Sequence, residues 1–97
     1  MQEIKDIKKK IAPILLENDV QFAGIFGSYG RGNENENSDI DILVKFKSSK
    51  SLLDIIGLEI TLSDFLGLRV DLVTDQALCP HIKKEVLKDF RLIYGER

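Results

Sequence analysis

Two aspartates separated by a single residue stand in the segment GSYGRGNENENSDIDILV, which runs from residue 27 to residue 44. The apolar residues around and after them predict a strand. Because side chains alternate faces along a strand, Asp39 and Asp41 project to one face while the apolar residues project to the other. Their Cα atoms then lie roughly 6.6 Å apart, close enough for both carboxylates to converge on shared cations. The segment therefore predicts a site for divalent metal and nucleotide.

A Gly-Ser pair precedes these aspartates. Gly27 ends a predicted strand, Ser28 stands where a helix or tight turn would begin, and Gly30 and Gly32 leave the nearby backbone without side chains. Exposed backbone N–H groups at the start of a helix form a binding site for phosphate oxygens. The order G-x-x-G-x-G, however, matches neither the dinucleotide-binding fingerprint nor the lysine-containing phosphate loop. Taken alone, these glycines favour an ordinary turn from strand to loop over a phosphate site.

A third aspartate, Asp71, lies in the apolar run VDLVT. Alternation places Val70 and Leu72 on one face and Asp71 on the other. Asp71 is either a third member of the acidic site or an aspartate of an edge strand that faces water. Three carboxylates brought together without a cation would repel one another by several kcal/mol for each pair, at an effective dielectric constant near 20 and a separation of ~4 Å. Bound magnesium would relieve that repulsion.

Helical and strand patterns alternate along the chain. An amphipathic helix is expected from residue 2 to residue 17, with Pro13 producing either a kink or two abutting helical pieces. In the second helix, Ser51 is the expected N-cap and Gly67 the expected C-cap. The remaining predicted elements are strands at Val20–Phe26, Ile40–Phe46 and Leu68–Val73, a helical region after Thr74 or Asp75, and a short last strand at Leu92–Tyr94. The order α-β-β-α-β-α predicts an α/β (α+β) fold with a short mixed or antiparallel sheet of three to four strands flanked by helices.

The overall composition limits the classes of function. The chain has 97 residues and a formal net charge of −2, so residues 1–97 are expected to form one domain without the basic face that a nucleic-acid binder needs. Its single cysteine, Cys79, fits a reducing compartment. The sequence has no apolar run near the ~18 residues of a membrane span and no signal-peptide pattern at its start, so a cytoplasmic protein without membrane contact is expected. The single histidine, His81, is expected at the surface.

The combination of Gly27-Ser28, ten intervening residues, Asp39-x-Asp41 and a later strand aspartate is more specific than any of its parts. In this pattern, and in the stretches FGSYGRG, SDIDILV, VDLVT and IYG, the chain resembles the nucleotidyltransferase superfamily that includes DNA polymerase β. Within that superfamily it is similar to the minimal nucleotidyltransferases, the antitoxin partners of HEPN toxins. The resemblance covers nearly the whole chain. One departure is Gly30, where alanine is commoner in the family.

The resemblance implies a role for each of these residues. Asp39 and Asp41 would bind two magnesium ions, Asp71 would complete the site and help to take up a proton, and Gly27 and Ser28 would hold the β and γ phosphates of ATP. Arg31 is a further candidate phosphate contact, because its planar guanidinium matches phosphate oxygens. The implied reaction moves AMP from ATP to a tyrosine hydroxyl of a cognate HEPN ribonuclease toxin.

Two alternatives remain open at this stage. The same chemistry would serve a small-molecule acceptor, although relatives of that kind generally carry an added domain. Alternatively, the chain neutralises a toxin by contact alone, for which the strongly apolar helix from Leu52 to Leu66 is the best support. A metal-dependent glycosyltransferase also uses D-x-D, but its fold needs a much longer chain.

Overall fold

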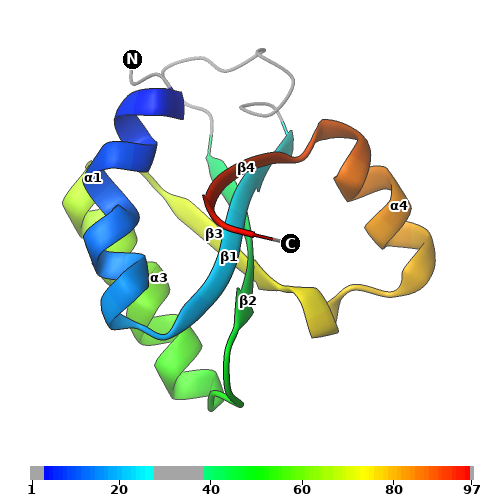
Figure 1. Ribbon diagram of the computed structural model, residues 1–97, viewed down its shortest axis with the longest axis horizontal. Coiled ribbons are helices and arrows are strands. Elements are labelled where there is room, and N and C mark those ends of the chain that lie inside the picture. Colours follow the sequence, from blue (N-terminus) through cyan, green and yellow to red (C-terminus); the bar gives the residue numbers. More distant parts are fainter. Residues whose placement is uncertain (1–3, 28–38, 97) are drawn as a thin grey trace.

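A four-stranded mixed sheet lies between two helices on one face and a third helix on the other (Figure 1). The computed structural model describes residues 4–27 and 39–96. The elements are α1 (Ile4–Glu17), β1 (Val20–Phe26), β2 (Ile40–Phe46), α3 (Leu52–Leu66), β3 (Val70–Thr74), a 3-10 turn η1 (Asp75–Ala77), α4 (Pro80–Asp89) and β4 (Arg91–Gly95). The predicted fold class and element order are confirmed, and the short last strand is β4.

The order of strands across the sheet is β3-β2-β1-β4. β1 pairs antiparallel with both β2 and β4, whereas β2 and β3 run parallel. A parallel pair needs a crossover connection, which α3 supplies. The crossover sets β3 as an edge strand beside β2, so residues 30 positions apart in the sequence become neighbours.

The main core fills the space between the sheet and the helices α1 and α3. Ile7, Ile11 and Leu15 of α1 are fully buried there, at the helical spacing seen in the sequence. Pro13 lies inside α1, which is one helix from residue 4 to residue 17 rather than two separate pieces. A smaller cluster on the other face contains Phe22, Leu43 and Val86 and is covered by α4.

Helix α3 begins and ends as its sequence predicts. Ser51 accepts a hydrogen bond from the Asp54 N–H, and the Asp54 carboxylate accepts one from the Ser51 N–H, which completes a capping box. Gly67 follows in the left-handed conformation, with φ of 68°, and its N–H donates to the Ser63 carbonyl. These two caps define where the crossover leaves β2 and enters β3.

Among the described residues, no helix has the length and apolar character needed to cross a membrane.

Candidate active site

Asp41 and Asp71 are direct neighbours across the parallel strands β2 and β3. Neighbouring strands lie about 4.8 Å apart, and paired residues of a parallel ladder project to the same face. Both side chains are half-buried and lie on the face that α4 partly covers, because Ile42 and Leu72 of the same strands belong to the core on the opposite face. Two like charges therefore share one face at the same level of the sheet.

Asp39 lies just before β2 and faces Arg69, which lies just before β3. The pairing of Ile40 with Val70 continues the register toward Asp39 and Arg69. The Asp39 Oδ2 atom is 4.0 Å from Arg69 Nε, and the side chains are 42% and 78% exposed. An ion pair this exposed contributes little, about 0 to 1 kcal/mol, so it leaves Asp39 free to turn.

The carboxylates of Asp39, Asp41 and Asp71 thus follow one another along a single face of the sheet. Asp41 and Asp71 lie side by side, whereas the carboxylate of Asp39 is directed to a guanidinium. Within residues 4–27 and 39–96, no three acidic, histidine or cysteine side chains are close enough together to form a ready-made ion site. All three groups nevertheless offer the hard oxygen ligands that divalent cations prefer.

Gly27 borders this row of acids. β1 ends at Phe26, the partner of Asp41 in the antiparallel ladder, and Gly27 follows with φ of 73°. A Cβ atom at Gly27 would overlap the Asp41 carboxylate. Both the positive φ and the close approach require glycine here. The backbone at the end of β1 therefore lies directly beside the acidic pair. Ser28 and Arg31, the other predicted phosphate contacts, lie outside the described residues.

Two side chains of α3 hold β3 in place. The N–H groups of Val70 and Leu72 point away from β2, toward the open edge of the sheet. The Val70 N–H donates to Ser63 Oγ at 3.1 Å, and the Leu72 N–H donates to Glu59 Oε2 at 2.8 Å. These amides flank Asp71 in the sequence, so the two contacts fix the segment that carries it. Sequence reasoning missed this role, although Glu59 and Ser63, two polar residues four positions apart on a mostly apolar helix, were the available signal.

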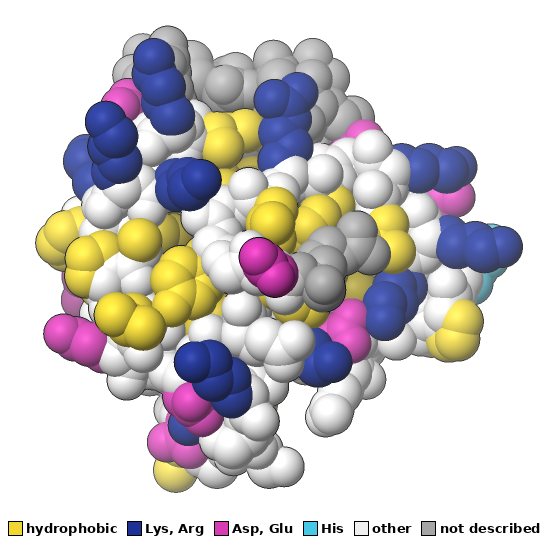
Figure 2. All heavy atoms as spheres, in the orientation of Figure 1, with side chains coloured by type: hydrophobic (Ala, Val, Ile, Leu, Met, Phe, Trp, Pro, Cys, Tyr) yellow, Lys and Arg dark blue, Asp and Glu magenta, His cyan; other side chains and the backbone are white. Residues whose placement is uncertain are grey.

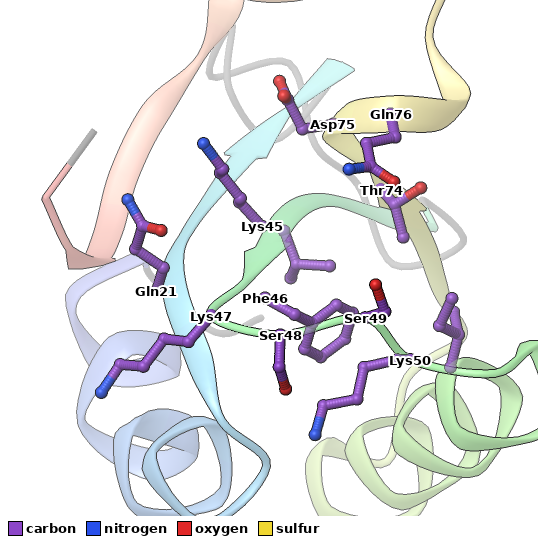
Figure 3. A pocket seen from close by; sticks show the side chains of 12 residues that line it. Gln21, Lys45, Phe46, Lys47, Ser48, Ser49, Lys50, Thr74, Asp75 and Gln76 are labelled. Carbon is purple, nitrogen blue, oxygen red and sulfur yellow. The ribbon is translucent and has the colours of Figure 1, made fainter.

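A pocket lined by described residues lies at the other end of β2, away from the acidic row. It has a volume of about 520 Å³ and is lined by residues including Lys45, Phe46, Thr74 and Gln76. Figure 3 shows the ammonium groups of Lys47 and Lys50 pointing away from that of Lys45. Lys50 is moreover paired with Asp19 at 3.5 Å. The lysines do not converge on a common point, so this pocket is not a formed anion site.

Comparison with known proteins assigns the family. Residues 9–97 match the family model described as polymerase beta, nucleotidyltransferase. The chain belongs to this nucleotidyltransferase family. A protein adenylyltransferase, MntA, of Thermococcus cleftensis is 51% identical over 70 residues, which cover 72% of this chain and 71% of that protein. The predicted nucleotidyltransferase is thereby confirmed, and membership implies a nucleotide substrate and, as is usual in the family, a divalent metal.

Solved structures of toxin-antitoxin complexes share the fold. A crystal structure of a toxin-antitoxin with AMP-PNP matches with a TM-score of 0.82 and 28% identity, over 93% of this chain and 74% of that one. A complex of the tri-AMPylated HEPN toxin of Shewanella oneidensis with its MNT antitoxin matches with a TM-score of 0.74 and 25% identity, over 93% of this chain and 71% of that one. The structural neighbours agree with the fold class and with the family expected from the motifs.

Proposed function

We propose that this chain is an antitoxin that transfers AMP from ATP to a tyrosine hydroxyl of a cognate HEPN toxin. The observation that carries the proposal is the row of three aspartates beside Gly27. Support comes from the similarity to MntA of Thermococcus cleftensis, named as a protein adenylyltransferase, and to the complex that contains an AMPylated HEPN toxin. We place the reaction in the cytoplasm, where ATP is available and an exposed free thiol such as Cys79 stays reduced.

Each residue has a defined task in this proposal. Asp39 and Asp41 would hold two Mg²⁺ ions, with Asp71 completing the site, and Gly27, Ser28 and Arg31 would hold the β and γ phosphates. When bound, such ions neutralise charge on the phosphates and activate the attacking oxygen. Asp71 accepts the proton of the tyrosine hydroxyl as its oxygen bonds to the α phosphorus. The bond from that phosphorus to the bridging oxygen breaks, and pyrophosphate leaves.

The shape of the site favours an acceptor supplied by another protein. Asp41 and Asp71 lie half-buried on the face of the sheet that α4 partly covers, and the pocket of about 520 Å³ that described residues line is at the opposite end of β2. A protein can carry its own hydroxyl to the acidic row, because its binding energy comes from contacts elsewhere on the surface. This arrangement supports the protein acceptor over the small-molecule acceptor.

The test is adenylylation of the HEPN protein that accompanies this chain in the genome. With ATP and Mg²⁺, we expect mass spectrometry to find adenylyl groups on a tyrosine of that protein, together with loss of its toxicity. The Asp39→Asn/Asp41→Asn variant should transfer none and should fail to rescue growth. An unmodified HEPN protein after incubation with the folded wild-type chain would contradict the proposal.

A second candidate function, neutralisation by contact alone, is favoured by the exposed apolar side chains of α3. The same double variant separates the two functions. If the variant binds and silences the HEPN protein as well as the wild type does, contact suffices and the acidic row is not needed for neutralisation.

A further inference from the structure

One side of α3 exposes a stripe of large apolar side chains, which we call the α3 stripe. It consists of Leu52, Leu53, Ile56 and Ile60, which are 71%, 80%, 41% and 54% exposed. Their spacing of three and four residues places them on one side of the helix. Figure 2 shows hydrophobic side chains gathered on the side of the molecule that α1 and α3 form. Scattered exposed apolar residues need no explanation, but a contiguous group of this kind marks a binding surface.

The α3 stripe borders the edge of the sheet that carries Asp71. Ser63 and Glu59 contact the edge amides of β3, which defines the side of α3 that faces this edge. Glu59 is three residues after Ile56, and Ser63 is three residues after Ile60, so the stripe adjoins that side. A protein seated on the stripe therefore lies next to β3, and its surface reaches Asp71 by passing around this edge of the sheet to the opposite face.

The charges of α3 define the chemistry of the occupant. The helix contains Asp54, Glu59 and Asp64 and no lysine or arginine. Asp64 is exposed and lies one turn beyond Ile60 on the same side. An apolar stripe with an acidic end fits an apolar surface that carries lysine or arginine at its rim. A second copy of this chain fits less well, because pairing α3 with α3 places carboxylates of both copies in the contact. Lys50, just before the helix, is already paired with Asp19.

The size of the stripe also favours a partner that reaches the active site. Specific interfaces bury about 800 Å² on each partner. Four side chains on one helix supply only part of that area, so the contact must extend beyond them. The adjoining surface in the direction of the substrate is the edge of β3.

We propose that the α3 stripe is the docking surface for the acceptor protein, which binds it through apolar side chains rimmed by basic ones. The contact delivers the acceptor hydroxyl to the acidic row along the edge of β3. This inference rests on the proposed function for the identity of the acceptor. It assigns recognition to α3 and chemistry to β2 and β3, so the two can be separated by substitution.

The experiment compares two matched double variants. Ile56→Gln/Ile60→Gln alters the stripe, while Ile82→Gln/Leu92→Gln alters two similarly exposed apolar residues, 50% and 45% exposed, on α4 and β4. At the three helical positions, glutamine keeps helix propensity close to that of isoleucine. Binding to the HEPN protein is measured by calorimetry without ATP, and adenylyl transfer is measured at varied HEPN concentration.

We expect the stripe variant to raise both the Kd and the KM for the HEPN protein by about tenfold or more, with kcat unchanged. The control variant should match the wild type in Kd, KM and kcat. Both variants should keep the wild-type thermal midpoint. Asp64→Asn should make binding less sensitive to salt. An equal Kd and KM for the two double variants would overturn the inference. So would sedimentation data in which the stripe variant loses self-association while its HEPN binding is intact.

The outcomes also separate this inference from the proposed function. If the wild type binds the HEPN protein through the stripe but transfers no AMP, the docking surface stands and the adenylyl transfer is wrong. If the wild type transfers AMP and the stripe variant does so with the same KM, the transfer stands and the docking surface is wrong.

Discussion

An aspartate stands at each end of the paired strands β1 and β2, and the two have opposite surroundings. At one end, Asp19 accepts a hydrogen bond from Ser48 Oγ at 2.6 Å and pairs with Lys50 at 3.5 Å. Its backbone carbonyl also accepts from the Lys47 N–H at 2.9 Å. At the other end, Asp41 lies against Gly27 and directly beside the like-charged Asp71.

We interpret this difference as a division of roles, in which Asp19 serves folding and Asp41 serves the proposed chemistry. The Ser48 hydroxyl, with Lys50, holds the pKa of Asp19 below its ordinary value, so the charged form belongs to the folded state. Asp41 and Asp71 bring two carboxylates to the same level of the sheet, where a bound cation would offset their like charges. The pocket of about 520 Å³ lies at the Asp19 end, so a pocket alone is a poor guide to the site in this molecule.

The strongest test of this contrast is Asp71→Asn. The substitution keeps the shape of the side chain and removes one of two adjacent like charges. Since losing even an outer partner of a metal site costs about 10- to 100-fold, we expect adenylyl transfer to fall by more than about 100-fold. The free energy of unfolding in urea should stay the same or rise by up to about 1 kcal/mol. Loss of several kcal/mol would show that Asp71 is a structural residue like Asp19.

Gly27→Ala and Gly67→Ala form a second pair. Both glycines have positive φ, so each substitution should lower the free energy of unfolding by about 1 to 2 kcal/mol. Only at Gly27 does the new methyl group meet the Asp41 carboxylate, whereas nothing lies within 4 Å of the corresponding position at Gly67. We expect transfer to fall by about 100-fold for Gly27→Ala alone. Equal activities in the two variants would remove Gly27 from the site.

The contacts of α3 with β3 are tested with Glu59→Ala and Glu59→Gln. Alanine removes the acceptor for the Leu72 N–H and should lower the free energy of unfolding by about 1 to 3 kcal/mol. Glutamine retains a carbonyl oxygen and should recover most of both stability and activity. Transfer should fall for the alanine variant through kcat, because the strand that carries Asp71 loses a support. If the two variants had the same free energy of unfolding and the same kcat, Glu59 would not position β3.

The smallest expected effect concerns pH at the Asp19 end. Because the pKa of Asp19 is lowered in the folded state, its contribution to stability is present above the ordinary carboxyl pKa and is lost as pH falls through the folded value. Ser48→Ala removes the largest cause of that shift. Its unfolding midpoint should therefore drop less than that of the wild type when the pH is lowered below about 4. Transfer at neutral pH should not change, which distinguishes this end from the acidic row.

Local sequence determined much of this protein. The order of elements, the caps at Ser51 and Gly67, the separation of faces around Asp39 and Asp41, and the Gly-Ser motif all depend on residues within a few positions of one another. Backbone alternation and helical periodicity act over that range, so reading them along the chain is sufficient. The family followed from the spacing between two such local features.

The tertiary structure alone decided which side chains from distant segments meet. The parallel register placed Asp71 beside Asp41 and Arg69 beside Asp39. The sequence had suggested only that the three aspartates lie near one another. The crossover set Ser63 and Glu59 against the edge amides of β3 and left the α3 stripe exposed, although the helix looked apolar on most sides. Register and helix orientation are settled by burying the whole core at once, and no short stretch of the chain contains that information.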